Sequence, residues 1–437
     1  MRTPPQTLFQ RLKYIGPSII VTGSVVGSGS IALTPLLGAA AGFTLLWWLL
    51  LSMWSKPLIQ AEISRYIIVK KKTFLEAFAD MPGFKTTIQG KTTSWLVWFM
   101  FIGVIPSVAG MGGLAGAVAE AGHLMVPYLS TEVWVVLCCL TTWLILYWGS
   151  YQTLERTLLV MVFFFSLVTL AIAIAMQSTP YEVTGQDIIQ GFSFSFPLEH
   201  AALALAVFGF TGISYGEIMA YTYWCLEKGY AKEEGDELED TKGWIKVMQT
   251  DVWVTVLLIT IGTLPFFLLG AGVLHQLELY PPPNGDIIQT LLNMFTEILG
   301  NWAKWLFVIL AFFVLFSTSL SGTAAFTRTI SDYLISTGLV LEKAQTRQKL
   351  IRLIAFLIPL FSGIAYFLLP NPITLLLIAG VWAAIGLPIV NIGALYLVNK
   401  LEKELQPKKA TKVVLWLTLS LQLTLALSII YSATIGI

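Results

Sequence analysis

Residues 16–43 read GPSIIVTGSVVGSGSIALTPLLGAAAGF, an apolar stretch with a cluster of small residues near its middle. About 20 apolar residues are enough to cross a bilayer as a helix, so the stretch predicts a membrane span. Glycine disfavours a helix by about 1 kcal/mol relative to alanine. The sequence therefore predicts local unwinding of the span at its central cluster, Gly27, Ser28, Gly29 and Ser30.

A second apolar stretch carries the same kind of interruption. Residues 203–224 read LALAVFGFTGISYGEIMAYTYW, with glycines at 209, 212 and 216 followed by the acidic residue Glu217. Both clusters lie near mid-span, which predicts two discontinuous helices. Close helix packing is the alternative explanation for such glycines, and we favour it for Gly112 and Gly116 in the stretch GMGGLAG at 110–116.

The whole chain has the composition of a membrane protein. Of its 437 residues, 56% are hydrophobic and 12% are charged, whereas globular proteins carry about 25% charged residues. The alternating polarity of membrane barrel strands is not seen. The sequence predicts an all-α polytopic protein with eleven transmembrane helices, near 15–41, 44–69, 95–119, 132–149, 157–176, 198–225, 251–274, 302–326, 350–369, 372–398 and 413–434.

The basic residues predict the orientation in the membrane. If the N-terminus is cytoplasmic, all but three of the 26 Lys and Arg residues fall in cytoplasmic segments, the exceptions being Lys56, Arg65 and Lys304. Cytoplasmic loops of membrane proteins are enriched in these residues. We therefore predict an integral protein of the cell inner or plasma membrane, with the N-terminus in the cytoplasm and the C-terminus outside.

Several functional classes do not fit the sequence. It has no basic stripe with interleaved aromatic residues, so nucleic acid is not an expected partner. The three cysteines, Cys138, Cys139 and Cys225, lie in or beside apolar helices and predict neither a disulfide framework nor a zinc site. Phosphate-binding loops and hydrolase motifs are absent as well, so we predict neither enzyme activity nor a cofactor.

The interrupted spans are the first and the sixth, and each begins a half of five helices. Transporters built from inverted repeats place discontinuous helices at such positions and bind substrate between them near the bilayer midplane. We therefore predict one transmembrane domain over 1–437, with inverted repeats at 14–177 and 198–398 and an eleventh helix at 411–437.

The segment VGSGSIALTPLLGAAAGFTLLW at 26–47 resembles the NRAMP family of divalent-metal/proton symporters, which have the LeuT-type fold. It aligns without a gap to the family's "DPGN" segment, and it matches the following glycine–alanine pair and the "G-Y/F-x-L-L-W" segment at Gly38, Ala39, Gly42, Phe43, Leu45, Leu46 and Trp47. Three further segments are similar to the family: LLLSMWSKPLIQAEISRY at 49–66, STSLSGTAA at 317–325 and Leu387-Pro388. The resemblance covers nearly the whole chain and implies a transporter of this architecture.

The family's metal ligands are replaced in this chain. By the alignment, its Asp and Asn correspond to Gly27 and Ser30, its Met-Pro-His segment begins at Ile213, and its tenth-span Gln corresponds to Gly380. The resemblance therefore supports transport but not Mn²⁺ or Fe²⁺ specificity. Smaller residues at these positions also predict a larger site than that of the family.

The residues at the two breaks suggest several kinds of substrate. We expect the site to be formed by backbone, hydroxyl and carboxylate groups of Gly27, Ser28, Gly29, Ser30, Thr211, Gly212, Ser214, Tyr215 and Glu217. Such oxygen groups suit a hard cation that keeps some of its water. A small organic solute, or an anion held by the amides of 27–30, fits as well, and the sequence does not choose among them.

Charged residues inside spans are costly and usually functional. Glu217 is expected to act as a substrate counter-ion or proton carrier, or else to cap the second half of the sixth span. Lys56 lies deep in the second span and is expected either to neutralise a carboxylate of a neighbouring helix or to take part in coupling. Arg328 and Asp332, four residues apart, are expected to form an ion pair.

We thus predict a secondary transporter that moves a metal cation or another small solute across the lipid bilayer, driven by a proton or ion gradient. A membrane sensor that keeps the fold without transporting is the alternative, because the metal ligands are missing. A channel is disfavoured, since no filter-like loop is present. The substrate, the coupling ion and the oligomeric state are not determined by the sequence.

Overall fold

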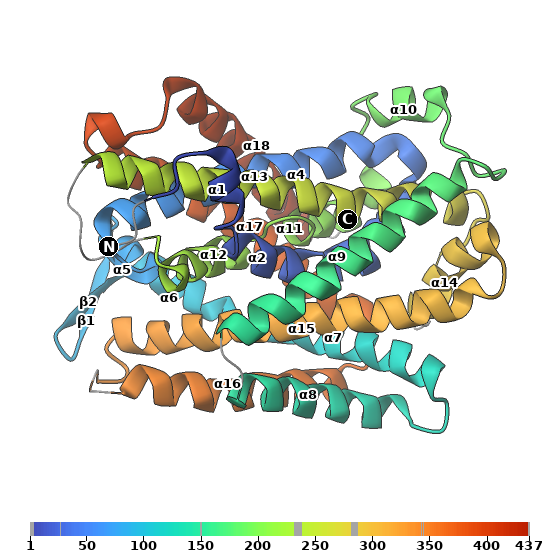
Figure 1. The fold of residues 1–437 in the computed structure, drawn as a ribbon, viewed down its shortest axis with the longest axis horizontal. Helices are drawn as coiled ribbons and strands as arrows, with labels where there is room; N and C mark the ends of the chain where they lie inside the picture. The colour runs from blue at the N-terminus through green and yellow to red at the C-terminus, as the bar shows by residue number, and fades with distance from the viewer. Residues whose placement is uncertain are drawn as a thin grey trace.

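The computed structural model of the chain describes residues 4–26, 28–148, 151–230, 238–280, 287–341, 343 and 345–435, and these are predominantly helical (Figure 1). The first part of the chain forms α1 (Leu8–Leu12), α2 (Pro17–Val25), η1 (Ser28–Leu33), α3 (Thr34–Ala41), η2 (Gly42–Leu45), α4 (Leu46–Lys70), α5 (Phe74–Ala79), β1 (Lys85–Ile88), β2 (Lys91–Ser94), α6 (Trp95–Ile102), α7 (Val104–Met125), α8 (Thr131–Trp148), α9 (Tyr151–Met176) and α10 (Gly185–Gly191). Strands β1 and β2 form an antiparallel hairpin with Lys85 opposite Ser94.

All the regular elements of the second part are helices, joined by turns and short loops. It forms η3 (Leu198–His200), α11 (Ala201–Phe210), α12 (Tyr215–Lys228), α13 (Leu238–Leu269), η4 (Gly270–Leu274), α14 (Ile287–Leu299), α15 (Ala303–Ser336), α16 (Thr346–Leu368), α17 (Pro372–Asn399), η5 (Lys403–Leu405) and α18 (Lys409–Ile435). All eleven predicted spans coincide with helix in the structure.

The predicted all-α polytopic class is confirmed. Nine stretches of the described residues are long and apolar enough to cross a membrane, and the first of them, Pro17–Lys70, contains two of the predicted spans. Helix α9 corresponds to the predicted fifth span and is additional to these nine. The number eleven itself stays a prediction.

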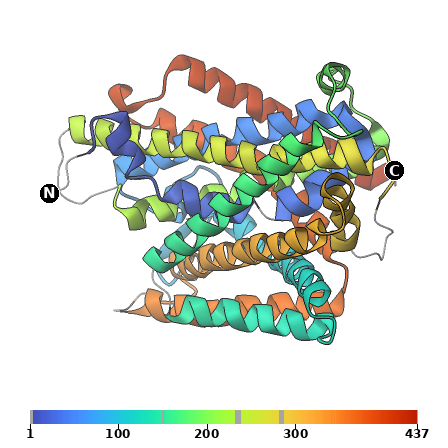
Figure 2. The same ribbon diagram turned by 45° about the vertical axis from the view of Figure 1, so that its right-hand side comes forward.

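The helices are stacked in layers with their axes roughly along the long direction of the molecule (Figure 1). Helices α8 and α16 lie along one side, α4, α13 and α18 lie along the other, and α2, α11 and α12 lie between them (Figures 1 and 2). The short elements mark the two ends. We call the end with α5 and the β1–β2 hairpin the hairpin end, and the end with α10 and α14 the α14 end.

Both predicted helix breaks are present. Helix α2 ends at Val25 and the π-helix η1 begins at Ser28, while Gly27 lies outside the described residues. Helix α11 ends at Phe210, and α12 begins four residues after Thr211, at Tyr215. The breaks lie side by side, because the Thr211 hydroxyl donates to the Gly29 carbonyl at 3.3 Å. The discontinuous first and sixth helices are thereby confirmed.

The glycines of α7 serve helix packing, as predicted for the third span. A Cβ at Gly112 would lie 2.6 Å from the carbonyl oxygen of Ser362 in α16. A Cβ at Gly116 would lie 2.4 Å from the ring of Tyr366 in the same helix. Both positions therefore require glycine for α7 and α16 to approach this closely.

Candidate transport site

The break in the sixth span is closed by a capping box. Gly212 has a φ of +75°, a conformation that glycine adopts readily, and it turns the chain between α11 and α12. Ser214 caps α12: its hydroxyl oxygen accepts from the Gly216 amide at 3.2 Å. The Glu217 carboxylate in turn accepts from the Ser214 amide at 3.1 Å and from the Ser214 hydroxyl. The α12 helix thus begins in the interior with a carboxylate at its positive end.

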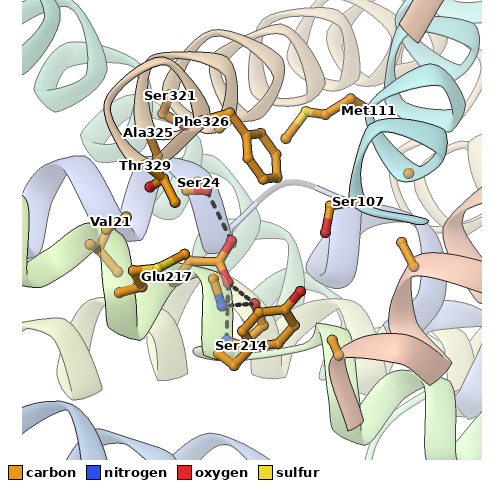
Figure 3. A pocket seen from close by; sticks show the side chains of 18 of the residues that line it. Val21, Ser24, Ser107, Met111, Ser214, Glu217, Ser321, Ala325, Phe326 and Thr329 are labelled. Atoms are coloured by element: carbon orange, nitrogen blue, oxygen red, sulfur yellow. Dashed lines mark hydrogen bonds between the residues drawn. The ribbon is translucent and has the colours of Figure 1, made fainter. Parts of the chain in front are cut away.

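The same carboxylate links the two broken spans. The hydroxyl of Ser24, in the last turn of α2, donates to Glu217 Oε1 at 3.2 Å (Figure 3). Glu217 is half-buried, and it lines a cavity that holds about 70 Å³. The side chain caps α12, as one interpretation of the sequence predicted, and it also borders the cavity, while its role as counter-ion or proton carrier stays a prediction.

The cavity is lined by α2, α6, α7, α11, α12, α15 and α17 and follows α12 from the break toward the hairpin end. Its polar lining consists of hydroxyl groups and one carboxylate, from Ser24, Ser107, Ser214, Tyr215, Glu217, Thr318, Ser321, Thr329 and Tyr333 (Figure 3). Glu217 is the one acidic side chain among the described residues that line it. The remaining wall is apolar and includes Met100, Met111, Met219, Phe210, Trp224 and Phe326.

Three of the predicted site residues line this cavity, namely Ser214, Tyr215 and Glu217. Ser30 does not: its hydroxyl is buried and hydrogen-bonded to that of Thr263 in α13 at 2.6 Å. The Thr211 hydroxyl is likewise engaged by Gly29 and Thr34. The lining also excludes Gly29, Gly212, Ile213, Gly380 and Lys56, while Gly27 and the side chain of Ser28 are outside the described structure. The roles of all these residues stay predictions.

The expected enlargement of the site is wrong at one of the replaced positions, Gly380. A Cβ at Gly380 would lie 2.8 Å from the carbonyl oxygen of Ala206, because α17 packs directly against α11. Gly29, where no enlargement was expected, is packed as closely, since a Cβ there would lie 2.9 Å from the carbonyl oxygen of Phe210. The neighbouring backbone fills the space that larger side chains would need. The small residues therefore bring the helices together rather than widening the cavity.

Lys56 reaches the break from α4. Its ammonium group is buried and donates to the carbonyl oxygens of Phe208 and Thr211, each at 2.7 Å. These carbonyls belong to the end of α11, where free acceptors and the helix dipole favour a cation. Within the described ranges the hydrogen-bond partners of Lys56 are these two carbonyls, and it forms no ion pair with a carboxylate. The lysine thus stabilises the end of the broken helix.

Asp251 is a buried carboxylate that sequence reasoning placed only at the start of a span. Its oxygens accept from the amides of Gly16 at 3.1 Å and Ser18 at 2.9 Å, and from the Tyr221 hydroxyl at 2.7 Å. Asp251 of α13 therefore caps α2 and holds α12 beside it. The sequence signal for this role was a single acidic residue at the start of an apolar run, which is costly in a membrane unless it is paired. Its partner, the Gly-Pro start of α2, is distant in the chain.

The predicted ion pair between Arg328 and Asp332 is wrong. Arg328 of α15 pairs with Glu227 of α12 at 2.6 Å, and its guanidinium lies over the ring of Trp224. Asp332 pairs instead with Arg347, at the start of α16, at 2.7 Å. Partners on other helices have displaced the local one, and the Arg328 pair joins α15 to α12 where α12 approaches its hairpin end.

Comparisons with known proteins agree with this architecture. The sequence profile of the family described as Natural resistance-associated macrophage protein-like matches residues 18–432. A relative from Pasteurella multocida, Uncharacterized protein PM0681, is 23% identical over 357 residues, which span 78% of this chain and 74% of that protein.

Two solved structures show a similar fold. A variant of the manganese transporter of Eremococcus coleocola has a TM-score of 0.73 at 15% identity, with 99% of this chain and 89% of that chain covered. Mhp1, a nucleobase-cation-symport-1 family transporter, has a TM-score of 0.54 at 14% identity, with 94% and 90% covered. The fold is that of LeuT-type transporters, with its first and sixth helices discontinuous. The chain belongs to the Natural resistance-associated macrophage protein-like family and is a membrane transporter rather than an enzyme.

Proposed function

We propose that the protein transports a small, partly hydrated metal cation, with Glu217 as its charged ligand, and that a proton or ion gradient drives the transport. The observation that carries the proposal is the position of this carboxylate at the joined helix breaks, facing a cavity lined by hydroxyl groups. Oxygen ligands of this kind suit hard cations such as Mg²⁺, which retains several waters when bound.

The size of the cavity supports an ion over a larger solute. A cavity of about 70 Å³ has room for a few water molecules, whereas pockets for drug-sized ligands hold about 300–1,000 Å³. The similar structure from Eremococcus coleocola is that of a manganese transporter, and manganese is a transition metal. We expect this chain to be less selective for such metals, since one carboxylate and several hydroxyls replace the softer ligands that they prefer.

Replacing Glu217 with glutamine should abolish most of the uptake without unfolding the protein. Glutamine at this position still closes a capping box. It removes the negative charge, and hydrogen bonds to charged groups contribute about 1.5–3 kcal/mol, so we expect about a ten- to hundredfold loss of uptake. The measurement is uptake of Mg²⁺, Mn²⁺ and Na⁺ into proteoliposomes that contain the purified protein.

The control is Glu76→Gln, because Glu76 forms the same capping box with Thr73 on α5 but is exposed and does not line the cavity. This variant should transport like the parent protein. Full uptake by Glu217→Gln, or no uptake of any of the three ions by the folded parent protein, would refute the proposal.

The orientation and the repeats are part of the same proposal. We propose that the hairpin end is cytoplasmic, because Lys70, Lys71, Lys72, Lys85 and Lys91 gather there. Residues 14–177 and 198–398 would then be inverted repeats whose first helices meet at the cavity. Labelling of a cysteine at position 89, in the hairpin turn, from only the outer face of intact cells would contradict this orientation.

A further inference from the structure

The cavity at Glu217 extends toward a second hollow, which lies at the hairpin end of the molecule. This hollow holds about 710 Å³ and is lined by residues of α5, β2, α12 and α15, of the link between α4 and α5, and of the start of α16. We call it the hairpin-end cleft. Helices α12 and α15 line both the cavity and the cleft, so the contact between these two helices lies between the two hollows.

The boundary between the two hollows is narrow along both helices. On α12, Trp224 lines the cavity and the residue before it, Tyr223, lines the cleft. On α15, Tyr333 lines the cavity and the residue before it, Asp332, lines the cleft. Successive residues of a helix point about 100° apart, so the two hollows lie on adjoining faces of the same helix pair. A small movement of α12 away from α15 would therefore join them.

Contacts between side chains hold α12 and α15 together at this boundary. The Glu227 carboxylate of α12 accepts from Arg328 Nε at 2.6 Å and from Arg328 Nη2 at 3.4 Å. The same guanidinium lies 4.5 Å from the centroid of the Trp224 ring, and the Tyr333 hydroxyl lies 3.8 Å from the Met219 sulfur. The side chains of Arg328 and Glu227 are only 15% and 28% exposed, so water screens their attraction incompletely.

The helices beside Phe210 and Ala379, at the other end of the cavity, are held together differently. There α11 packs against α17 so closely that a Cβ at Gly380 would lie 2.8 Å from the Ala206 carbonyl oxygen. Rotation of side chains cannot open a contact between two backbones, whereas an Arg–carboxylate pair separates when its side chains change rotamer. The smaller rearrangement therefore opens the cavity toward the hairpin end.

We propose that the transported cation passes between the cavity and the hairpin-end cleft through the α12–α15 contact, and that the Arg328–Glu227 pair is the gate of this passage. The inference rests on the proposed function. It assigns a role to two residues outside the cavity, neither of which is among its described lining residues. Glu227 lines the cleft, so its carboxylate faces the ion on the far side of the gate.

The charges of the pair suit a gate for cations. Arg328 Nη1 also donates to the Ala324 carbonyl oxygen of its own helix at 2.9 Å, so the guanidinium stays with α15 when the pair separates. The closed pair places a positive charge beside Trp224, where the cavity ends, and this charge opposes the approach of a cation. Separation of the helices frees the Glu227 carboxylate, which attracts the cation into the cleft.

Opening of the gate is measured by the modification of a cysteine in the cavity. Ala325→Cys places a thiol among the lining residues of α15 (Figure 3), in a background in which the three native cysteines are replaced by alanine. The probe is a trimethylammonium methanethiosulfonate reagent, applied to the protein in detergent. Glu227→Gln keeps the size of the side chain and removes its charge, so we expect modification to become at least about threefold faster. Asp80→Asn is the control, because it breaks the Lys72–Asp80 pair, which lines the same cleft but joins α4 to α5.

Closure of the gate is tested with cysteines at 227 and 328, joined by a short bifunctional methanethiosulfonate in the same background. The link should reduce Mg²⁺ uptake into proteoliposomes by at least about tenfold, and dithiothreitol should restore it, which shows that the protein has stayed folded. Cysteines at 72 and 80, linked in the same way, should leave uptake unchanged. Unchanged modification at position 325 in Glu227→Gln, or full uptake with the 227–328 link in place, would each overturn the inference. The modification experiment requires no transport, so its result is separate from a failure of the proposed function.

Discussion

Replacement of Asp251 by alanine is expected to destabilise the protein by about 3–5 kcal/mol and to release α2 from α13 and α12. The substitution removes the shared acceptor of the Gly16 amide, the Ser18 amide and the Tyr221 hydroxyl. Each buried donor left without an acceptor costs about 1–3 kcal/mol, and the amides of Gly16 and Ser18 lose their side-chain acceptor at once, whereas the Tyr221 hydroxyl keeps the Met248 carbonyl oxygen at 3.4 Å. Because these donors lie on α2 and α12, both halves of the broken-helix site should loosen together.

Thermal unfolding in detergent measures the loss of stability, and amide hydrogen exchange shows where the structure opens. Asp187→Ala is the matched control, because Asp187 also caps a helix, α10, but does so at the surface with Thr184. Loss of a surface cap costs about 0.5–2 kcal/mol and should leave exchange in α2 unchanged. If α2 exchanges at the parental rate in Asp251→Ala, the carboxylate does not hold that helix in place.

Introduction of the family's glutamine at Gly380 is expected to separate α17 from α11 rather than to restore a metal ligand. The first side-chain carbon would already lie 2.8 Å from the Ala206 carbonyl oxygen. The packing is closer still at Gly209, where a Cβ would lie 2.0 Å from the Gly380 carbonyl oxygen. Overpacking costs about 1–3 kcal/mol and more where backbone is the obstacle, so we expect Gly380→Gln to lose stability and uptake.

Thermal unfolding and calorimetric titration with Mn²⁺ test this expectation together. Gly216→Ala serves as a control for adding a side chain to a helical glycine, because the atom nearest to its new Cβ would be Ser214 Oγ at 3.6 Å. Alanine favours a helix over glycine by about 1 kcal/mol, so this variant should unfold at the same or a higher temperature. A stable Gly380→Gln protein with tighter Mn²⁺ binding would contradict the packing described here.

The sequence predicted the fold well because membrane helices are specified locally. Long apolar runs predict spans, and the glycine clusters near 27–30 and 209–216 predict the two breaks, both of which are present. Gly29 and Gly212 depart from regular α-helix because each lies in a cluster of small residues that disfavours helix. Packing at Gly112 and Gly116 was predictable for the same reason, since glycines four apart form one smooth helix face.

The arrangement within the site depends on contacts between distant segments, and here the sequence was less informative. Asp251 and Gly16 are 235 residues apart, so nothing local indicates that one caps the other. Arg328 binds Glu227 on another helix instead of the nearby Asp332. The loss of side chains at Gly380 suggested free space, yet a neighbouring backbone fills it. Whether a residue faces the cavity or its neighbours is decided by packing, which the pattern of residues does not specify.

The hydrogen bond from Ser24 to Glu217 has a consequence for how cargo acts on the carrier. An incoming ion that takes Glu217 Oε1 competes with the hydroxyl that ties the last turn of α2 to α12. Binding of an ion and the contact between α2 and α12 therefore compete for one oxygen atom. A ligand shifts a conformational equilibrium only through its differential affinity for the two states. Under the proposed function, the difference would be built into one shared acceptor, so that ion binding at Glu217 would release the last turn of α2 from α12.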